Sequence, residues 1–334
     1  MKNEFAYLPY LSIVIPIYNE AAGLPQLFAR LIPVLDWIGR SYEILLTNDG
    51  SVDDSLTLLR EFQGQRPREV RVIDFNGNFG QHMAIMAAFE RVRGQIVVTL
   101  DADLQNPPEE IPKLVAAVEA GHDVAGGYRR DRQDGTFRRY ASRLLNILRE
   151  RTTGIAMRDQ GCMLRAYNRR IVDLVAASGE STVYIPALAA RYARRPIDIE
   201  VAHATRVAGD SKYNFYSLVR LNFDLMTSFS VMPLRVFTMF GMAVAVGSTL
   251  FVAYLFVRRI LVGPEAEGVF TLFAILFLIL GVAIFGLGII GEYIGRIYQE
   301  VRRRPRYVIR ETIESGAMPP AAMSQSENDG VSII

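Results

Sequence analysis

Short apolar segments alternate with helical segments before about Pro233, and this alternation limits the fold more than any other feature. Runs typical of β-strands occur at Leu11–Pro16, Tyr42–Thr47, Val70–Phe75, Gln95–Leu100 and Asp123–Gly127. Patterns typical of helices lie between them, at Leu24–Trp37, Asp53–Phe62, His82–Val92 and Pro108–Ala120. Such alternation favours a mostly parallel, doubly wound sheet. We therefore expect an α/β fold, a mostly parallel sheet flanked by helices.

Two carboxylates follow the strand predicted at Gln95–Leu100, in the sequence Asp101-Ala-Asp103-Leu-Gln105. The carboxyl ends of strands in open α/β sheets are where ligands bind. One of the two carboxylates can hold a metal while the other meets another part of the ligand. Hard divalent cations bridge such oxygen ligands to substrate phosphates. The pattern predicts a metal-and-phosphate site; a turn with a helix cap is the alternative reading.

Polar residues also follow the first two predicted strands, at Tyr18-Asn-Glu20 and Asn48-Asp49-Gly-Ser. Neighbouring strands that both end in polar residues form a crevice in which a base and a ribose can bind. No Gly-x-Gly-x-x-Gly follows the first strand, which argues against a dinucleotide oxidoreductase. No Gly-x-x-x-x-Gly-Lys-Ser/Thr is present either, which argues against a phosphate-loop ATPase. Three dispersed histidines, His82, His122 and His203, do not have the spacing of a zinc site.

Two uncharged stretches, Val236–Val257 and Val269–Gly291, each match the ~20 apolar residues that a membrane-crossing helix needs. Arginines follow the second stretch, whereas the loop between the two holds only Arg258 and Arg259. The positive-inside rule then places the carboxyl terminus and the amino-terminal domain in the cytoplasm. The single cysteine, Cys162, excludes an intrachain disulfide and agrees with a reducing compartment. We expect a multi-pass membrane protein with both termini cytoplasmic.

The segment before the first stretch, Lys212–Val231, mixes aromatic, aliphatic and polar residues. It is either an interfacial helix lying on the lipid headgroups or an amphipathic helix packed on the soluble domain. The predicted organisation is a catalytic domain at 1–210, a juxtamembrane amphipathic helix at 211–232, a two-helix transmembrane hairpin at 233–295, and a basic segment with a disordered tail at 296–334. A net charge of +2 gives no indication of nucleic acid as a partner. A phosphate site held against a membrane suggests one soluble and one lipid substrate.

Four motifs together resemble family-2 glycosyltransferases of GT-A fold, within the branch that acts on polyprenyl phosphates. They are Pro16-x-Tyr18-Asn-Glu20, Asp49-Gly-Ser, Asp101-Ala-Asp103-Leu-Gln105-x-Pro-Pro-Glu and Arg206-x-x-Gly209-x-Ser211-Lys212. Longer runs, among them Asn78-Phe-Gly-Gln-His-Met-Ala and Gly291-Glu-Tyr-Ile-Gly-Arg, are most similar to formamido-arabinose transferases of that branch. The likeness covers about Leu11 to Tyr307. One departure is Asn48, where many relatives carry Asp.

The resemblance implies a role for each matching residue. Residues that contact the nucleotide would be Pro16, Tyr18, Glu20, Asp49, Asp101, Ala102 and Arg129. Asp103 and Gln105 would hold Mg²⁺ or Mn²⁺, which neutralises the leaving UDP. Asp159 matches the position of a proposed catalytic carboxylate, for which we expect a positioning or electrostatic role, or only the capping of a loop. The resemblance also implies a bacterial inner membrane as the location and, from relatives with two spans, a homo-oligomer, a tetramer.

The acceptor in this branch is a phosphate monoester with a second pKa of about 6, so it is mostly dianionic at neutral pH. A dianion is already nucleophilic and needs cations more than a base. The residues expected to bind the acceptor phosphate are Arg138, Arg206, Ser211 and Lys212.

The reading favoured by the sequence is transfer of one sugar, formamido-arabinose, from UDP to undecaprenyl phosphate at the cytoplasmic membrane face, for lipid A modification. Transfer of glucose or mannose to a polyprenyl phosphate is the alternative. A processive polysaccharide synthase would need a Gln-x-x-Arg-Trp motif, but Trp37 in the first helix is the sole tryptophan. A non-enzymatic membrane scaffold is the remaining alternative, and the intact Asp101, Asp103 and Gln105 argue against it.

Overall fold

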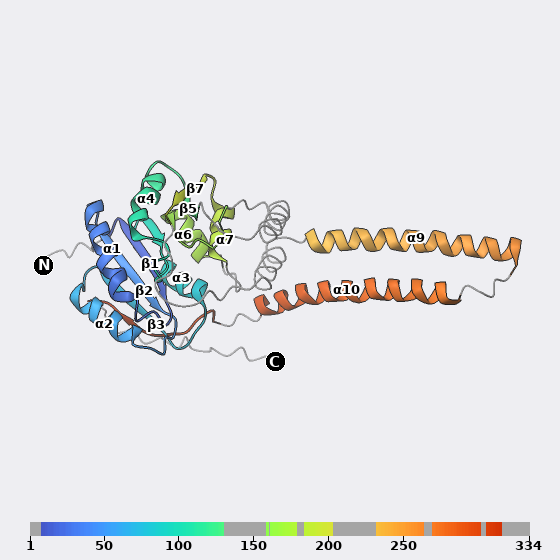
Figure 1. Cartoon of the computed structure of the whole chain (residues 1–334), viewed down its shortest axis with the longest axis horizontal. Coiled ribbons are helices and arrows are strands. Elements are labelled where there is room, and N and C mark those ends of the chain that lie inside the picture. Colours follow the sequence, from blue (N-terminus) through green and yellow to red (C-terminus); the bar gives the residue numbers. More distant parts are fainter. Residues whose placement is uncertain are drawn as a thin grey trace, which may run out of the picture.

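A computed structural model of the chain describes residues 8–129, 158–159, 161–178, 184–202, 232–263, 269–301 and 305–315. The described residues form an α/β domain from which two long helices extend (Figure 1). The strands are β1 (Leu11–Ile17), β2 (Tyr42–Asn48), β3 (Val70–Phe75), β4 (Ile96–Thr99), β5 (Val124–Arg129), β6 (Arg165–Asn168), β7 (Pro196–Val201) and β8 (Ile309–Ile313). The helices are α1 (Leu24–Ile38), α2 (Ser55–Gln65), α3 (Gln81–Phe89), η1 (Pro108–Glu110), α4 (Ile111–Glu119), α6 (Arg169–Ala176), α7 (Ile185–Tyr192), α9 (Met232–Val262) and α10 (Val269–Val301).

The strands form one sheet in the order β7-β5-β6-β4-β1-β2-β3-β8. β1 pairs in parallel with β2 and β4, β2 with β3, and β5 with β7. β6 and β8 run antiparallel to their neighbours. The sheet is therefore mostly parallel, and this part of the predicted fold is confirmed.

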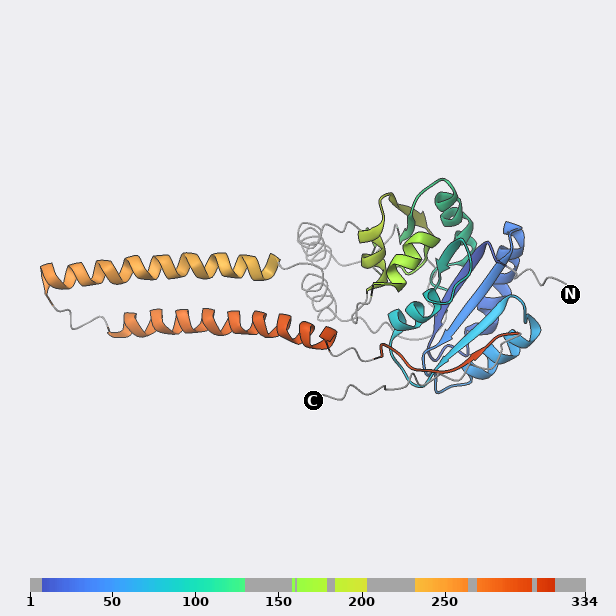
Figure 2. The same cartoon turned by 180° about the vertical axis from the view of Figure 1, so that it is seen from behind.

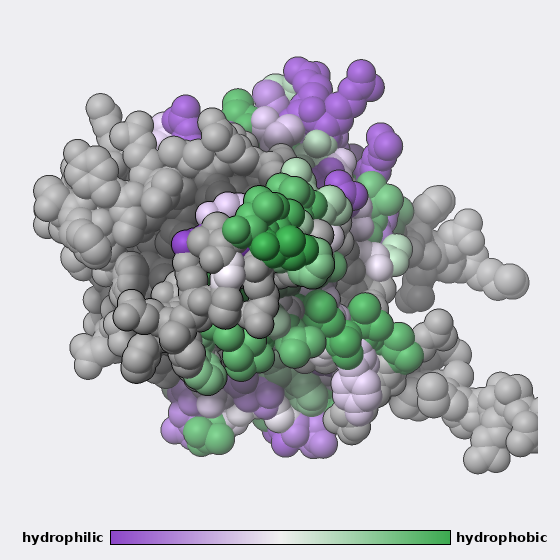
Figure 3. Space-filling view, turned by 90° about the vertical axis from the view of Figure 1, so that its right-hand side faces the viewer, coloured by the Kyte–Doolittle hydropathy of each residue, from purple (hydrophilic) through white to green (hydrophobic). Residues whose placement is uncertain are grey.

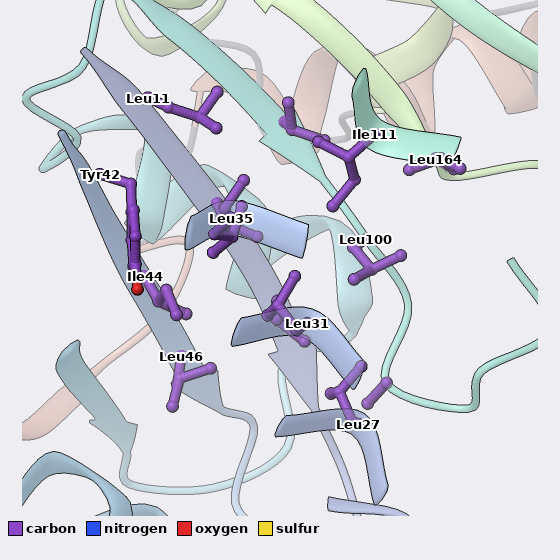
Figure 4. Close-up of a cluster of buried hydrophobic side chains, with 14 of the residues drawn as sticks. Leu11, Leu27, Leu31, Leu35, Tyr42, Ile44, Leu46, Leu100, Ile111 and Leu164 are labelled. Atoms are coloured by element: carbon purple, nitrogen blue, oxygen red, sulfur yellow. The ribbon is translucent and has the colours of Figure 1, made fainter. Parts of the chain in front are cut away.

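Helices cover both faces of the sheet, and each face has its own hydrophobic cluster (Figures 1 and 2). On one face, alternate residues of β1 pack with α1, α2 and α4. Figure 4 shows Leu31 and Leu35 of α1 lying over β1, beside Ile44 of β2, in this cluster. On the other face, Val14 and Leu45 pack with α3, α6 and α7. Because both faces are buried, the strands carry continuous apolar runs instead of an alternating pattern.

The five predicted strands and four predicted helices of the amino-terminal half are all present, with ends shifted by a few residues. The sequence analysis did not identify β6, α6, α7, β7 or β8. The predicted juxtamembrane helix at 211–232 lies outside the described residues, apart from its last residue, with which α9 begins.

α9 and α10 lie side by side and run in opposite directions (Figures 1 and 2). The rings of Phe237 and Phe285 meet edge to face at 6.0 Å, and a Cβ at Gly286 would overlap the ring of Phe237. Viewed from their far end, the helices present mainly hydrophobic residues (Figure 3). Over the part of the chain that the structure describes, no helix is both long enough and apolar enough to be identified as a membrane span.

β8 returns the chain from α10 to the sheet, where it pairs with β3. A buried ion-pair network secures this edge. Arg71 Nη1 lies 2.9 Å from Glu43 Oε2, and Arg71 Nε lies 2.7 Å from Glu314 Oε2. Glu43 also accepts from the Ser12 hydroxyl at 2.7 Å. The sheet thus includes a segment that follows α10, outside the 1–210 boundary predicted for the catalytic domain.

We expect Arg71→Met to destabilise the protein strongly, by about 3 kcal/mol, because it leaves the buried Glu43 carboxylate without its ion pair. Arg60→Met is the matched control, since it removes only the exposed ion pair with Glu311 and should cost less than about 1 kcal/mol. Denaturant unfolding of the purified protein measures both changes. Equal stability of the two variants would contradict a structural role for the Arg71–Glu43 pair.

Candidate active site

Four polar loops meet where β4, β1, β2 and β3 end. These strands are neighbours and run in parallel, so their carboxyl ends lie along one edge of the sheet. The chain proceeds from β1 to β2 and β3 on one side, then returns to β4 on the other side of β1. Ligands of open α/β sheets bind at such a change of direction. The loops after these four strands therefore form the candidate site.

The loops after β1 and β2 are tied together by hydrogen bonds. Asn19 has a φ of 55°, and its backbone N–H donates to Ser51 Oγ at 3.0 Å. In return, the Val52 N–H donates to Asn19 Oδ1 at 2.9 Å. Asn tolerates this left-handed conformation better than most residues. The Glu20 N–H donates to Ser55 Oγ at 3.0 Å, and the Tyr18 ring before it is exposed.

Asp49 is a buried carboxylate held by the loop after β3. Its Oδ1 accepts from the Phe79 N–H at 2.7 Å, and its Oδ2 accepts from the Gly80 N–H at 2.9 Å. Burial raises the pKa of the Asp49 carboxyl above its ordinary value, and the two backbone N–H groups oppose this rise. The Asp49 backbone N–H donates to Ile17 O at 2.8 Å, which fixes the residue to the end of β1.

Gly50 lets the loops after β2 and β3 pack closely. It has a φ of 68°, and a Cβ at this position would overlap the backbone of Gly77. A larger residue would be strained in its backbone and would push the two loops apart. The Asp-Gly sequence after β2 is thus required by the packing around Asp49.

Asp101, after β4, is held by two amides. Gln81 Nε2, at the start of α3, donates to Asp101 Oδ1 at 2.6 Å. Asn106 Nδ2 lies 3.4 Å from Asp101 Oδ2, and Cys162 Sγ lies 3.5 Å from Asn106 Oδ1. Because Gln81 follows Phe79 and Gly80, one short segment holds both Asp49 and Asp101. Sequence reasoning assigned no role to Gln81 or Asn106, although both lie in runs that carried the family resemblance.

The loop after Asp101 turns sharply at Leu104, which is buried and has a φ of 58°. Asp103 Oδ1 accepts from the Gln105 N–H at 3.1 Å across this turn. Ala102 is buried, whereas Asp101, Asp103 and Gln105 are partly exposed. Carboxylate and amide oxygens are suited to a hard divalent cation. Among the described residues, no group of three His, Cys, Asp or Glu side chains could hold a metal.

Asp159 is buried in a loop that reaches the Asp101 region through Cys162. Its Oδ1 accepts from the Gly161 N–H at 3.0 Å. The buried Arg165 guanidinium donates to two backbone carbonyls of this loop. Nη2 lies 2.8 Å from Asp159 O, and Nε lies 3.1 Å from Cys162 O. Cys162 is buried, and its Sγ is the atom that approaches Asn106.

The other predicted site residues are placed as follows. Pro16 lies in β1, one strand position before Ile17, and is partly buried. Arg129 is the last residue of β5, and its side chain lies outside the described residues. Arg138, Arg206, Ser211 and Lys212 also lie outside the described residues.

Comparison with known proteins identifies the class. Residues 12–175 match the glycosyl transferase family 2 model, and residues 232–297 match the GtrB C-terminal hairpin model. The chain belongs to glycosyl transferase family 2. A family-2 domain is followed in it by a C-terminal hairpin.

Similar proteins from two bacteria match almost the whole chain. An undecaprenyl-phosphate 4-deoxy-4-formamido-L-arabinose transferase of Edwardsiella ictaluri is 49% identical over 94% of this chain and 97% of the relative. A protein of the same name from Klebsiella pneumoniae is 48% identical over 95% of this chain and 97% of the relative. These matches confirm the predicted family membership.

Two solved structures share low sequence identity with the chain. Glucosyl-3-phosphoglycerate synthase from Mycobacterium tuberculosis, in complex with Mn²⁺, UDP and phosphoglyceric acid, is 17% identical, with a TM-score of 0.44 over 66% of this chain and 76% of that chain. S. aureus TarS 1-349 in complex with UDP-GlcNAc is 17% identical, with a TM-score of 0.43 over 66% of this chain and 67% of that chain.

His82, the second residue of α3, lies near the site and carries a buried ring nitrogen. Its Nδ1 is buried without a hydrogen-bond partner among the described residues, and its ring meets Tyr184 at 5.0 Å. Burial lowers the pKa of His82 from 6.5 to about 4. As the pH falls, the imidazole of the unfolded chain is protonated at a higher pH than that of the folded protein. The contribution of neutral His82 to the free energy of unfolding is therefore complete above pH 6.5 and is lost as the pH falls towards 4.

We expect His82→Phe to reduce the loss of stability between pH 7 and pH 4.5, by up to about 3 kcal/mol, because the variant has no imidazole to protonate. Thermal melting of both proteins across this range measures the difference. His122→Gln is the control, because its imidazole lies in a surface turn beside Arg195 O. A wild-type acid sensitivity in His82→Phe would contradict the burial of a neutral imidazole.

Proposed function

We propose that this protein transfers 4-deoxy-4-formamido-L-arabinose from a UDP donor to undecaprenyl phosphate. The observation that carries this proposal is the 49% identity to a transferase of that name over almost the full length of both chains. The intact carboxylates Asp49, Asp101 and Asp103 at the switch point of the sheet support an active enzyme. The product would feed lipid A modification and thereby lower the negative charge of the cell surface.

The donor nucleotide would bind in the crevice between the loops after β1, β2 and β4. The exposed ring of Tyr18 offers a face for the uracil, and Pro16 and Glu20 border the same loop. The Asp49 carboxylate, held by two N–H groups, is an acceptor for the uracil N–H or a ribose hydroxyl. Asp101 and Ala102 would lie against the nucleoside. Arg129 would contact the diphosphate, since guanidinium groups suit bidentate phosphate contacts.

A divalent cation, Mg²⁺ or Mn²⁺, fits the oxygen donors of Asp103 and Gln105. Such cations are commonly held by one or two carboxylates together with substrate phosphates. When bound, the cation would neutralise the charge that develops on the leaving UDP. The turn at Leu104 brings Asp103 and the Gln105 backbone within hydrogen-bonding distance, so both ligands belong to one compact loop.

The acceptor phosphate would attack the anomeric carbon of the sugar. A new bond forms between a phosphate oxygen and that carbon, while the carbon–oxygen bond to UDP breaks and UDP leaves with the electron pair, inverting the anomeric configuration. Because the acceptor dianion carries no proton that must be removed, its site must supply positive charge. Arg138, Arg206 and Lys212, with the Ser211 hydroxyl, are the proposed contacts. Asp159, fixed by Gly161 and Arg165, would position the acceptor side instead of abstracting a proton.

We further propose that α9 and α10 cross the membrane and hold the catalytic domain, with both termini, on its cytoplasmic side. The helices have 31 and 33 residues, and apolar side chains such as Leu250, Phe256 and Leu287 are exposed on them. Over the complete sequence, Val236–Val257 and Val269–Gly291 carry no charged residue. An exposed apolar surface of this length is stable in hydrocarbon and unfavourable in water. The match to the GtrB C-terminal hairpin supports the pairing of the two helices. A homotetramer stays a prediction from the resemblance.

The sugar can be tested directly. Membranes that contain the protein are incubated with undecaprenyl phosphate and UDP-linked formamido-arabinose, glucose or mannose, and the lipid product is analysed by mass spectrometry. Product from the formamido-arabinose donor alone supports the proposal. Product only from the glucose or mannose donor would establish the alternative assignment.

We expect Asp103→Asn to reduce turnover by at least about tenfold while leaving the fold intact, because it removes a charged metal ligand at a strand end outside the core. Activity assays at a series of Mn²⁺ concentrations, with circular dichroism, measure the effect. Asp173→Asn is the control, since Asp173 is exposed on α6 and pairs only with Arg169 in the described structure. Normal metal-dependent turnover in Asp103→Asn would contradict the metal assignment.

We expect Arg206→Ala and Lys212→Ala to slow transfer by one to two decades, because a charge-assisted contact to phosphate contributes roughly 1.5–3 kcal/mol. UDP affinity should change far less, provided that these residues bind the acceptor phosphate as proposed. Asp159→Asn should be milder and should not recover between pH 6 and pH 9, as no base is lost. Calorimetry with UDP and lipid glycosylation assays separate the effects. Rescue of a severely impaired Asp159→Asn at high pH would indicate a hydroxyl acceptor instead.

A further inference from the structure

The segment 305–315, which we call the C-terminal strap, contacts β3 and the loop that follows it, next to the proposed donor site. It follows α10 in the chain and contains β8, which pairs with β3 at the edge of the sheet. Three of its residues contact the strand or loop that leads to the candidate site. Arg310 binds Asp74, Tyr307 stacks on Phe75 with 5.0 Å between ring centroids, and Val308 O accepts from the Asn76 N–H at 2.9 Å.

A row of three polar side chains crosses the sheet from the strap to the loop after β2. Arg310 Nε donates to Asp74 Oδ2 at 2.6 Å, and Asn48 Nδ2 donates to Asp74 Oδ1 at 2.7 Å. Asn48 and Asp74 lie opposite each other in the β2–β3 register and are almost completely buried. The register between β3 and β8 shifts at Asp74 and Phe75, and Arg310 lies at this irregularity. Both oxygens of the buried carboxylate are thereby satisfied.

The row ends directly beside Asp49. Asn48 precedes Asp49 in the chain. The Ser51 backbone N–H, two residues after Asp49, donates to Asn48 Oδ1 at 3.4 Å. The second support reaches Asp49 through aromatic rings, since Phe75 contacts Phe79 edge to face at 5.6 Å and the Phe79 N–H binds Asp49. The backbone before Asp49 is thus held through Asn48 and Asp74, and its carboxylate is held by Phe79, which packs on Phe75. Asp74 and Phe75 both contact the strap.

We propose that Arg310, Asp74 and Asn48 form a relay that positions Asp49 for donor binding. The inference rests on the proposed function, in which Asp49 contacts the nucleoside. It also explains why an amide at position 48 suits this chain. An Asp at position 48 would face the Asp74 carboxylate at hydrogen-bonding distance without a proton donor between them, and a buried carboxylate pair is unfavourable. These three are positioning residues, because none of them is proposed to touch the substrate.

The relay is tested by exchanging its donor and acceptor. Asn48→Asp should raise the Kd for UDP by about tenfold, the effect of losing one buried hydrogen bond to a charged group. The double variant Asn48→Asp with Asp74→Asn restores a complete row, since the new amide can donate to position 48 and accept from Arg310. We expect its UDP affinity to return to within about threefold of wild type. Each Kd is measured well below the melting temperature of the variant, so that a loss of stability alone does not lower the measured affinity.

Arg310→Met is the second variant, and because it leaves the buried Asp74 carboxylate without its ion pair it should also cost stability, which thermal melting measures separately. It should also weaken UDP binding and raise the donor KM while leaving the acceptor KM unchanged. Glu311→Gln is the matched control on the same strand, since Glu311 pairs with Arg60 at the surface. Calorimetry with UDP on the full-length protein, at a temperature where each variant is folded, measures the effect.

The outcomes separate the relay from the donor site. UDP binding that is weakened by Asp49→Ala but unchanged by Asn48→Asp and Arg310→Met would overturn the relay alone. A double variant that folds but binds UDP as poorly as Asn48→Asp would also overturn it. If Asp49→Ala bound UDP as well as wild type, the donor site itself would be wrong, and the relay with it.

Discussion

The parallel register of β4, β1, β2 and β3 is the constraint on which the candidate site depends. Parallel pairing aligns the carboxyl ends of these strands, so that loops distant in the chain meet at one edge. Burial of both faces beneath helices makes the register costly to change, because a shift of one residue would turn apolar side chains away from their clusters. This register brings Asp49 and Asp101 to the same segment, Phe79 to Gln81, which donates hydrogen bonds to both carboxylates.

Backbone groups and amides hold the carboxylates of the site in place. Asp49 is held by two backbone N–H groups, and Asp101 by the amides of Gln81 and Asn106. Neutral donors fix a carboxylate without removing its charge, which leaves that charge for a ligand. The segment from Phe79 to Gln81 supplies donors to both residues, so the loop after β3 is a shared support of the site.

The C-terminal strap makes the catalytic sheet depend on both ends of the chain. Its pairing with β3, the Arg71–Glu314 ion pair and the Arg310–Asp74 ion pair all join residues more than two hundred positions apart. The hairpin of α9 and α10 is therefore an insertion between two parts of one sheet. Anchoring the two helices in a membrane, as proposed, would hold the catalytic domain through both of its connections.

The sequence by itself determined the strands and helices whose signal is local. β1 to β5 and α1 to α4 were predictable because continuous apolar runs and helical periodicity are present within each segment, and Asp101 and Asp103 were found because they follow such a run. β6, β7 and β8 were not predictable. β6 begins with Arg165 and ends with Asn168, and β8 contains Arg310 and Glu311, so neither segment has the apolar run of β1 to β4. The tertiary structure decided their pairing, the partners of Asp49 and Asp101, and the role of Asn48, because each depends on residues that only the folded sheet brings together.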